Sequence, residues 1–289
     1  MIPAPFDYSS PATLNEALTL LQQLGDDAKV LAGGHSLIPM MKLRLASPGH
    51  LIDINKISDL SFIKEEGGFV KIGALTREVE LEESDIVKKK FAIFIDATRL
   101  IADPQVRNMG TIGGNIAHGD AANDHPAIML ALRAEVIIAS LAGTRTVPID
   151  EFFFGFYSTA VQPGEILTEI RIPSPPKGTG SAYHKAERKA GDYAIAGVAV
   201  QLTLDGGVCK QVGIGLTNVN ATPLRATRSE EVLKGQKITA ELIEKAAQFA
   251  SEDCDPSDDL RGSADYKRSI LKTITKRMIQ KAIDRAAKS

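Results

Sequence analysis

Two glycine-rich segments carry the residue types best suited to holding a charged ligand. They are Ala32-Gly33-Gly34-His35-Ser36 and Thr111-Ile112-Gly113-Gly114-Asn115. Glycine lets the backbone approach a ligand closely and adopt positive φ, and successive backbone N–H groups in such a turn form a concavity that accepts a phosphate. Two such segments could hold both phosphates of a pyrophosphate. The pattern therefore predicts a dinucleotide site, and it differs from the G-x-G-x-x-G of nicotinamide-binding turns.

Either glycine pair alone could be an ordinary tight turn, because glycine marks turns generally. The pairs are accompanied by the hydroxyls of Ser36 and Thr111 and by the amide of Asn115. These polar groups favour ligand binding over two unrelated turns.

Composition points to a globular protein without an obvious polyanionic partner. The chain has 289 residues, 44% of them hydrophobic, and a formal net charge of -2, which gives no sign of a nucleic-acid or anionic-membrane partner. No apolar run approaches the roughly 18 residues that span a bilayer. The N-terminus lacks the basic region and apolar core of a signal peptide. We therefore expect a cytoplasmic protein that does not span a membrane.

The cysteines and histidines argue against a metal site on this chain. Cys209 and Cys254 lie far apart, and an iron–sulfur cluster bound by four thiolates needs more cysteines than these. The five histidines show no H-x-x-x-H pairing typical of zinc ligands. Any metal-based redox step is expected on another chain.

The first half of the chain reads as two α/β units, residues 1–56 and 57–176. In the first, Thr13 and Glu16 form a capping box for a helix that ends at Gly25. In the second, Asp124 is expected to be the N-cap of a helix through Leu132. The expected strands are 30–31, 51–54, 70–74, 135–139, 144–148 and 165–172, and part of 91–102 is expected to be helical.

A proline-rich linker at 173–178 places the domain boundary at residue 176. Residues 177–289 are expected to form an α+β domain. Its elements are three antiparallel strands at 182–188, 195–204 and 208–216, a hairpin turn at 205–207, and helices at 239–252 and after Ser263. The last helix shows an apolar stripe of Tyr266, Ile270, Ile274 and Met278.

Four segments together carry a resemblance to a known family. Residues 32–39, 101–107, 111–115 and 191–193 resemble the FAD-binding medium subunits of the molybdenum hydroxylase (xanthine dehydrogenase) family. Within it, the chain is most similar to the medium subunits of aerobic carbon monoxide dehydrogenases, over essentially its whole length. The resemblance implies an α+β fold: a two-subdomain FAD-binding domain of the vanillyl-alcohol-oxidase (PCMH) type, then a C-terminal domain with a three-stranded antiparallel sheet and helices.

The resemblance also implies a set of FAD-binding residues and no catalytic residue. The pyrophosphate would lie on Ala32, Gly33, Gly34, His35, Ser36, Thr111, Gly113, Gly114 and Asn115. Asp124 matches an acidic residue near the ribityl chain or the phosphates. Ile101 and Tyr193 match residues that flank the isoalloxazine ring, and Leu167 matches an apolar residue near the flavin.

Several of these residues have simpler explanations. Tyr193 could be a packed core aromatic, and Asp124 only a helix cap. His35 could attach FAD covalently, as in some relatives outside this subfamily. Outside that set, Lys29 could be a solvated strand-edge lysine or the basic residue that precedes the first segment. Arg107 could only brace a glycine loop, and His118 and His125 could be structural.

The function implied by the resemblance is electron transfer. Substrate would be oxidised at molybdenum on a large subunit. Electrons would cross two 2Fe–2S clusters on a small subunit, reach FAD on this chain, and leave to a quinone or another acceptor. The complex would be a dimer of heterotrimers in the cytoplasm, associated in some settings with the inner face of the membrane.

Three alternatives stay open at this stage. The chain could be the medium subunit of an aldehyde or N-heterocycle dehydrogenase of the same family. The chain could be a self-contained FAD-linked oxidase, although the segment after residue 176 is small for a substrate domain. It could also be a scaffold without flavin, against which the intact glycine segments argue.

Overall fold

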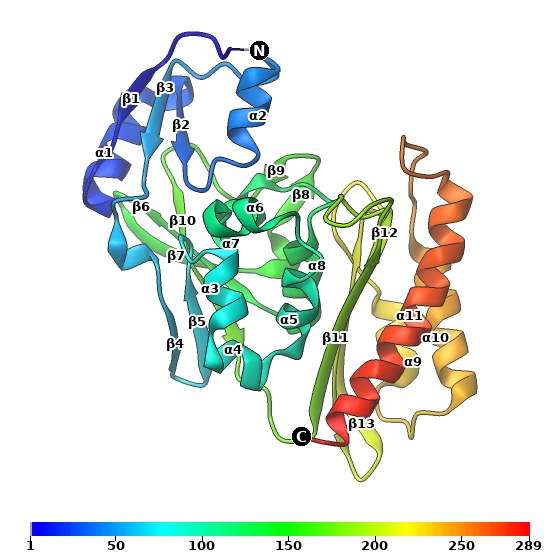
Figure 1. Cartoon of the computed structure of the whole chain (residues 1–289). Coiled ribbons are helices and arrows are strands. Elements are labelled where there is room, and N and C mark those ends of the chain that lie inside the picture. Colours follow the sequence, from blue (N-terminus) through cyan, green and yellow to red (C-terminus); the bar gives the residue numbers. More distant parts are fainter. Residues whose placement is uncertain (1) are drawn as a thin grey trace.

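The computed structural model describes residues 2–289 and consists of three packed parts (Figure 1). An N-terminal lobe lies above a central lobe, and a C-terminal sheet with its helices flanks the central lobe on one side. Among the described residues, no helix has both the length and the apolar character needed to cross a bilayer.

The N-terminal lobe is a small parallel sheet with two helices. Its strands are β1 (Asp7–Ser9), β2 (Ala28–Leu31) and β3 (His50–Asp53), in the order β1-β3-β2, and its helices are α1 (Leu14–Leu24) and α2 (Leu37–Lys42). The Thr13 side chain caps α1 by accepting from the Glu16 N–H, as predicted. The Glu16 carboxylate accepts from the Ala12 N–H, so the reciprocal bond of the capping box is shifted by one residue.

The central lobe is an antiparallel sheet covered by helices. The sheet has the order β4-β5-β10-β6-β7, formed by β4 (Ile63–Glu66), β5 (Phe69–Gly73), β6 (Glu135–Ser140), β7 (Gly143–Pro148) and β10 (Ile166–Pro173). Its helices are α3 (Glu78–Glu83), α4 (Asp85–Lys90), α5 (Ala92–Thr98), α6 (Pro104–Met109), α7 (Ile112–His118) and α8 (Asp124–Leu132). A hairpin of β8 (Phe153–Gly155) and β9 (Ser158–Thr159) completes the lobe.

The C-terminal part has the predicted α+β character with two additions. Its long strands are β11 (Thr179–Ala186), β12 (Ala196–Asp205) and β13 (Val208–Thr217), and its long helices are α10 (Ala240–Asp253) and α11 (Ala264–Ala286). A two-residue fourth strand, β14 (Leu224–Arg225), and helix α9 (Thr227–Leu233) were not predicted. Tyr266 is largely exposed and does not belong to the buried face of α11. The predicted domain boundary at 176 falls between β10 and β11.

Helix α8 joins the central lobe to the C-terminal sheet. Every residue of α8 is buried, because the helix packs between the two parts. Two glycines of β13 allow the approach. A Cβ at Gly213 would lie 2.1 Å from the Ala131 carbonyl oxygen, and one at Gly215 would lie 1.9 Å from that of Ala127. The C-terminal sheet therefore contacts the helix backbone directly, which fixes its side chains relative to the central lobe.

The prediction of Asp124 as the N-cap of α8 is wrong. Asn123 is the N-cap residue, and Asp124 is the first residue of the helix. The Asp124 carboxylate is directed instead toward residues of the C-terminal sheet.

Candidate cofactor-binding site

A cavity of about 900 Å³ opens where the three parts of the protein meet. It is lined by the β2–α2 loop, the N-terminus of α7, the segment before β10, and the turn at 191–193. All the residues predicted to bind a cofactor lie on its walls: Ala32, Gly33, Gly34, His35, Ser36, Ile101, Thr111, Gly113, Gly114, Asn115, Asp124, Leu167 and Tyr193. The fold thus brings together segments that are far apart in the sequence.

The first glycine segment presents free backbone donors to this cavity. Gly34 has a φ of +76°, a conformation that favours glycine. A Cβ at Gly33 would lie 2.4 Å from the Met109 carbonyl oxygen, so Gly33 permits close packing against the C-terminal end of α6. The N–H groups of residues 33–36 donate to no acceptor among residues 2–289. They are therefore available to an anionic ligand.

The second glycine segment is the start of a helix and not a loop. Thr111 caps α7, and its hydroxyl accepts from the Gly114 N–H at 3.2 Å. The N–H of Ile112 donates to Thr76, and the N–H of Gly113 donates to Ala74. The backbone N–H groups of residues 112–115 are thus already used. Gly113 is required by packing, because its Cβ would lie 2.6 Å from the Ala74 carbonyl oxygen.

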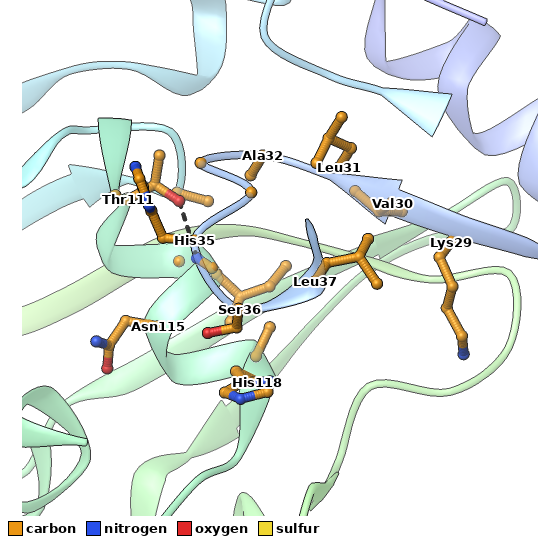
Figure 2. A pocket seen from close by; sticks show the side chains of 18 of the residues that line it. Lys29, Val30, Leu31, Ala32, His35, Ser36, Leu37, Thr111, Asn115 and His118 are labelled. Carbon is orange, nitrogen blue, oxygen red and sulfur yellow. Dashed lines mark hydrogen bonds between the residues drawn. The ribbon is translucent and has the colours of Figure 1, made fainter. Parts of the chain in front are cut away.

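What this second segment offers the cavity is a side-chain amide. The Oδ1 atom of Asn115 is buried and has no hydrogen-bond partner among the described residues. Figure 2 shows the first segment entering the pocket beside the helix that carries Thr111, Asn115 and His118. The two segments therefore differ in chemistry: the first supplies backbone N–H groups and the second supplies a polar side chain.

A buried charged cluster forms one wall. The Asp124 carboxylate accepts from the Tyr183 hydroxyl at 2.5 Å and from the Lys185 ammonium at 3.0 Å. All three side chains are at least nine-tenths buried. Burial, reinforced by the nearby Asp124 charge, holds the pKa of Tyr183 well above its ordinary value. Lys185 was missed by sequence reasoning, because its burial in β11 depends on Asp124 of α8, which lies 61 positions away.

Apolar side chains and Tyr193 form another part of the cavity lining. Ile101 and Leu167 are buried. Tyr193 is 42% exposed, so it is not a core aromatic. Gly191 makes its position possible, because a Cβ there would lie 2.5 Å from the Ala102 carbonyl oxygen. The Arg261 guanidinium lies 5.3 Å from the centre of the Tyr193 ring, a distance suited to a cation–π contact.

The structure also places the other residues that the sequence singled out. His35 is exposed on the first segment, and Lys29 also lines the cavity. Arg107 donates to the Ile101 carbonyl at 3.1 Å, so it braces the segment at 101 rather than a glycine loop. His118 stacks against Tyr157 with ring centres 4.7 Å apart, and burial lowers its pKa.

His125 is fully buried, and its Nε2 lies 2.8 Å from the Glu78 carboxylate. Burial alone would lower its pKa, but the charge and hydrogen bond of Glu78 raise it above 6.5 overall. The stabilisation from this pair is therefore complete below the unfolded pKa and is lost as pH rises through the higher native pKa. We expect the stability advantage of the wild type over His125→Gln to shrink as the pH rises from below 6.5 into the alkaline range, because the native pKa of His125 is raised. Urea unfolding of both proteins across this range measures it, and a constant difference would contradict the assignment.

Comparison with known proteins decides the family. Residues 4–175 match the FAD binding domain in molybdopterin dehydrogenase, and residues 181–282 match the CO dehydrogenase flavoprotein C-terminal domain. The chain belongs to the FAD-binding medium subunits of the molybdenum hydroxylases. As such it is the flavin-binding subunit of an oxidoreductase, and FAD is its cofactor.

Relatives of this flavin subunit match it over nearly the full length. The carbon monoxide dehydrogenase medium chain of Hydrogenophaga pseudoflava is 49% identical, over 99% of this chain and 100% of its own. That of Afipia carboxidovorans is 48% identical, over 99% of each chain. A solved structure of carbon monoxide dehydrogenase from Hydrogenophaga pseudoflava superposes with a TM-score of 0.97, at 50% identity and 99% coverage of both chains.

The cavity of the flavin subunit fits FAD on its own chemistry. Its volume is within the range of cofactor pockets, and it combines apolar walls with a few polar groups. Free N–H groups at 33–36 suit phosphate oxygens, and the unpartnered Asn115 amide needs a ligand or water to satisfy it. Apolar walls at Ile101 and Leu167 suit a flat ring system.

Proposed function

We propose that this chain is the electron-transfer subunit of a carbon monoxide dehydrogenase. The observation that supports the proposal is the full-length similarity to carbon monoxide dehydrogenase medium chains from two organisms. Electrons would arrive from 2Fe–2S clusters on a small subunit, after substrate oxidation at molybdenum on a large subunit. They would leave to an external acceptor such as a quinone.

FAD supplies the redox chemistry in this proposal, since it can accept electrons singly and release them in pairs, and the protein binds, orients and tunes it. The free N–H groups of the first segment would hold the pyrophosphate, with Thr111 and Asn115 beside it. Asp124, fixed by Tyr183 and Lys185, would meet the chain between the phosphates and the ring. Ile101, Leu167 and Tyr193 would exclude water around the ring.

Purification of the native complex tests the proposed partners. We expect the chain to co-purify with an iron–sulfur subunit and a molybdenum-binding subunit, as a dimer of heterotrimers. Turnover of carbon monoxide, compared with aldehydes and N-heterocycles, identifies the substrate of the large subunit. A native complex without an iron–sulfur protein would contradict the proposal, and alcohol oxidation by this chain alone would favour a self-contained oxidase.

The Tyr193→Ala variant separates tuning of the flavin from its binding. Because the phosphate-binding groups lie elsewhere in the cavity, we expect the variant to keep stoichiometric FAD. Loss of the ring opens that end to water, so the flavin reduction potential or its rate of reoxidation should change. Spectroelectrochemical titration and stopped-flow reoxidation measure these. If both match the wild type, Tyr193 has no role at the flavin.

A further inference from the structure

Arg77 contacts the second glycine segment directly, at Thr111, and reaches the first segment through Asn55. Its guanidinium donates to the Met109 carbonyl, two residues before the second segment, and to the Asn55 Oδ1 at 2.6 Å. Asn55 in turn donates through Nδ2 to the Ala32 carbonyl at 2.8 Å, where the first segment begins. One half-buried arginine and one half-buried asparagine thus connect two segments that belong to different lobes.

These contacts hold the backbone where the two segments touch. The Met109 carbonyl that Arg77 binds is the same group against which Gly33 packs. The backbone of Arg77 also forms an isolated β-bridge with Thr111, the N-cap of α7. Displacement of Arg77 would therefore release the contact surface of Gly33 and the start of α7 together.

Asn55 is held in one orientation by the N-terminal lobe. Its N–H and its Nδ2 both donate to the Asp53 Oδ1, at 2.9 and 2.6 Å, and Tyr8 donates to the Asp53 Oδ2 at 2.6 Å. Burial raises the pKa of Asp53, but the hydrogen bonds from Tyr8 and Asn55 and the charge of Arg77 outweigh it and lower that pKa overall. An ionised Asp53 accepts from the Asn55 amide nitrogen, so the amide oxygen faces Arg77.

We infer that Arg77 and Asn55 are positioning residues that set the separation of the two glycine segments, so that FAD affinity depends on them although neither lines the cavity. The inference rests on the proposed pyrophosphate site between those segments. Arginine suits the task because its planar fork reaches two acceptors at once, whereas lysine supplies a single point charge. The two acceptors that Arg77 joins lie in different lobes: the Met109 carbonyl in the central lobe and the Asn55 amide oxygen in the N-terminal lobe.

Titration of the flavin-free full chain with FAD, in the assembly in which it purifies, tests the inference. We expect Arg77→Ala to raise the dissociation constant roughly 30-fold, equivalent to about 2 kcal/mol at 1.4 kcal/mol per tenfold change. Arg77→Lys should restore little of the affinity. Asn55→Asp keeps the size of the side chain but cannot donate to Ala32, and it should also weaken binding. The Arg77→Ala/Asn55→Ala double variant should bind about as weakly as Arg77→Ala alone, because the two residues act as one unit.

Arg285→Ala is the matched control. Arg285 is also partly buried and bonds to Asp96 and to the Ser181 carbonyl, but it lies outside the cavity and its contacts. It should lower the thermal unfolding midpoint without changing the FAD dissociation constant. If the Arg77→Ala and Asn55→Asp variants both bind FAD as the wild type does, the positioning role is wrong. If Gly114→Val also binds normally, the proposed pyrophosphate site is wrong instead.

Discussion

The Gly114→Val variant is expected to fold but to purify without FAD. Gly114 faces the cavity, and a Cβ there would lie 2.7 Å from the Thr111 Oγ1 and 3.8 Å from the Ala32 Cβ. The branches of a valine would extend into the space between the two glycine segments and would push aside the hydroxyl that caps α7. Flavin absorbance per protein, measured on the purified variant, gives the result directly.

Gly155→Val is the control for this experiment. Gly155 is located in the β8–β9 hairpin, outside the cavity lining, and its Cβ would have only the Ser158 Cβ within 4 Å, at 3.9 Å. The control should keep its FAD. Stoichiometric FAD in Gly114→Val would show that the phosphates do not lie between the two segments.

The glycine segments were predictable from the sequence, but the reason for each glycine was not. Local pattern suggested that both segments leave room for phosphate. In the structure, Gly33 and Gly113 are needed for packing against Met109 and Ala74. Those neighbours come from other elements, so no local rule identifies them. For the same reason, the role of Arg77 could not be predicted from local sequence: its partners Asn55 and Met109 lie 22 and 32 positions away.

Asp124 shows how a local rule competes with tertiary contacts. Asp followed by His-Pro resembles a helix start, and a helix does begin there. The carboxylate is nevertheless used by Tyr183 and Lys185, 59 and 61 positions later. A side chain that a short-range pattern assigns to helix capping can instead bind residues distant in sequence. A buried lysine needs such a partner for its charge.

The elements that sequence reasoning missed are short and depend on their surroundings. β14 has two residues, and α9 has seven. The Glu230 side chain of α9 is buried and accepts from the Ile214 N–H and from Arg225. A buried glutamate breaks the apolar periodicity that identifies a helix. Tertiary hydrogen bonds, and not propensity, therefore account for this part of the fold.

The Asp124→Ala variant should show the largest loss of stability. Removing Asp124 leaves the Lys185 charge and the Tyr183 hydroxyl buried, with the Lys185 ammonium 3.8 Å from Glu187 as its remaining carboxylate partner. Breaking a buried ion pair in this way costs about 3–5 kcal/mol. Urea unfolding of the flavin-free proteins measures the difference, since bound FAD would add its own stabilisation.

Two further variants decide whether the unpaired lysine is the cause. Adding Lys185→Met to Asp124→Ala should recover much of the loss, because a buried charge without a good partner is then replaced by an apolar side chain. Asp255→Ala removes an exposed carboxylate 3.4 Å from Arg268 and should cost less than about 1 kcal/mol.

If the double variant is no more stable than Asp124→Ala, the loss comes from the Tyr183 contact or from the start of α8. A loss for Asp124→Ala as small as that for Asp255→Ala would mean that the cluster contributes little to the joint between α8 and the C-terminal sheet.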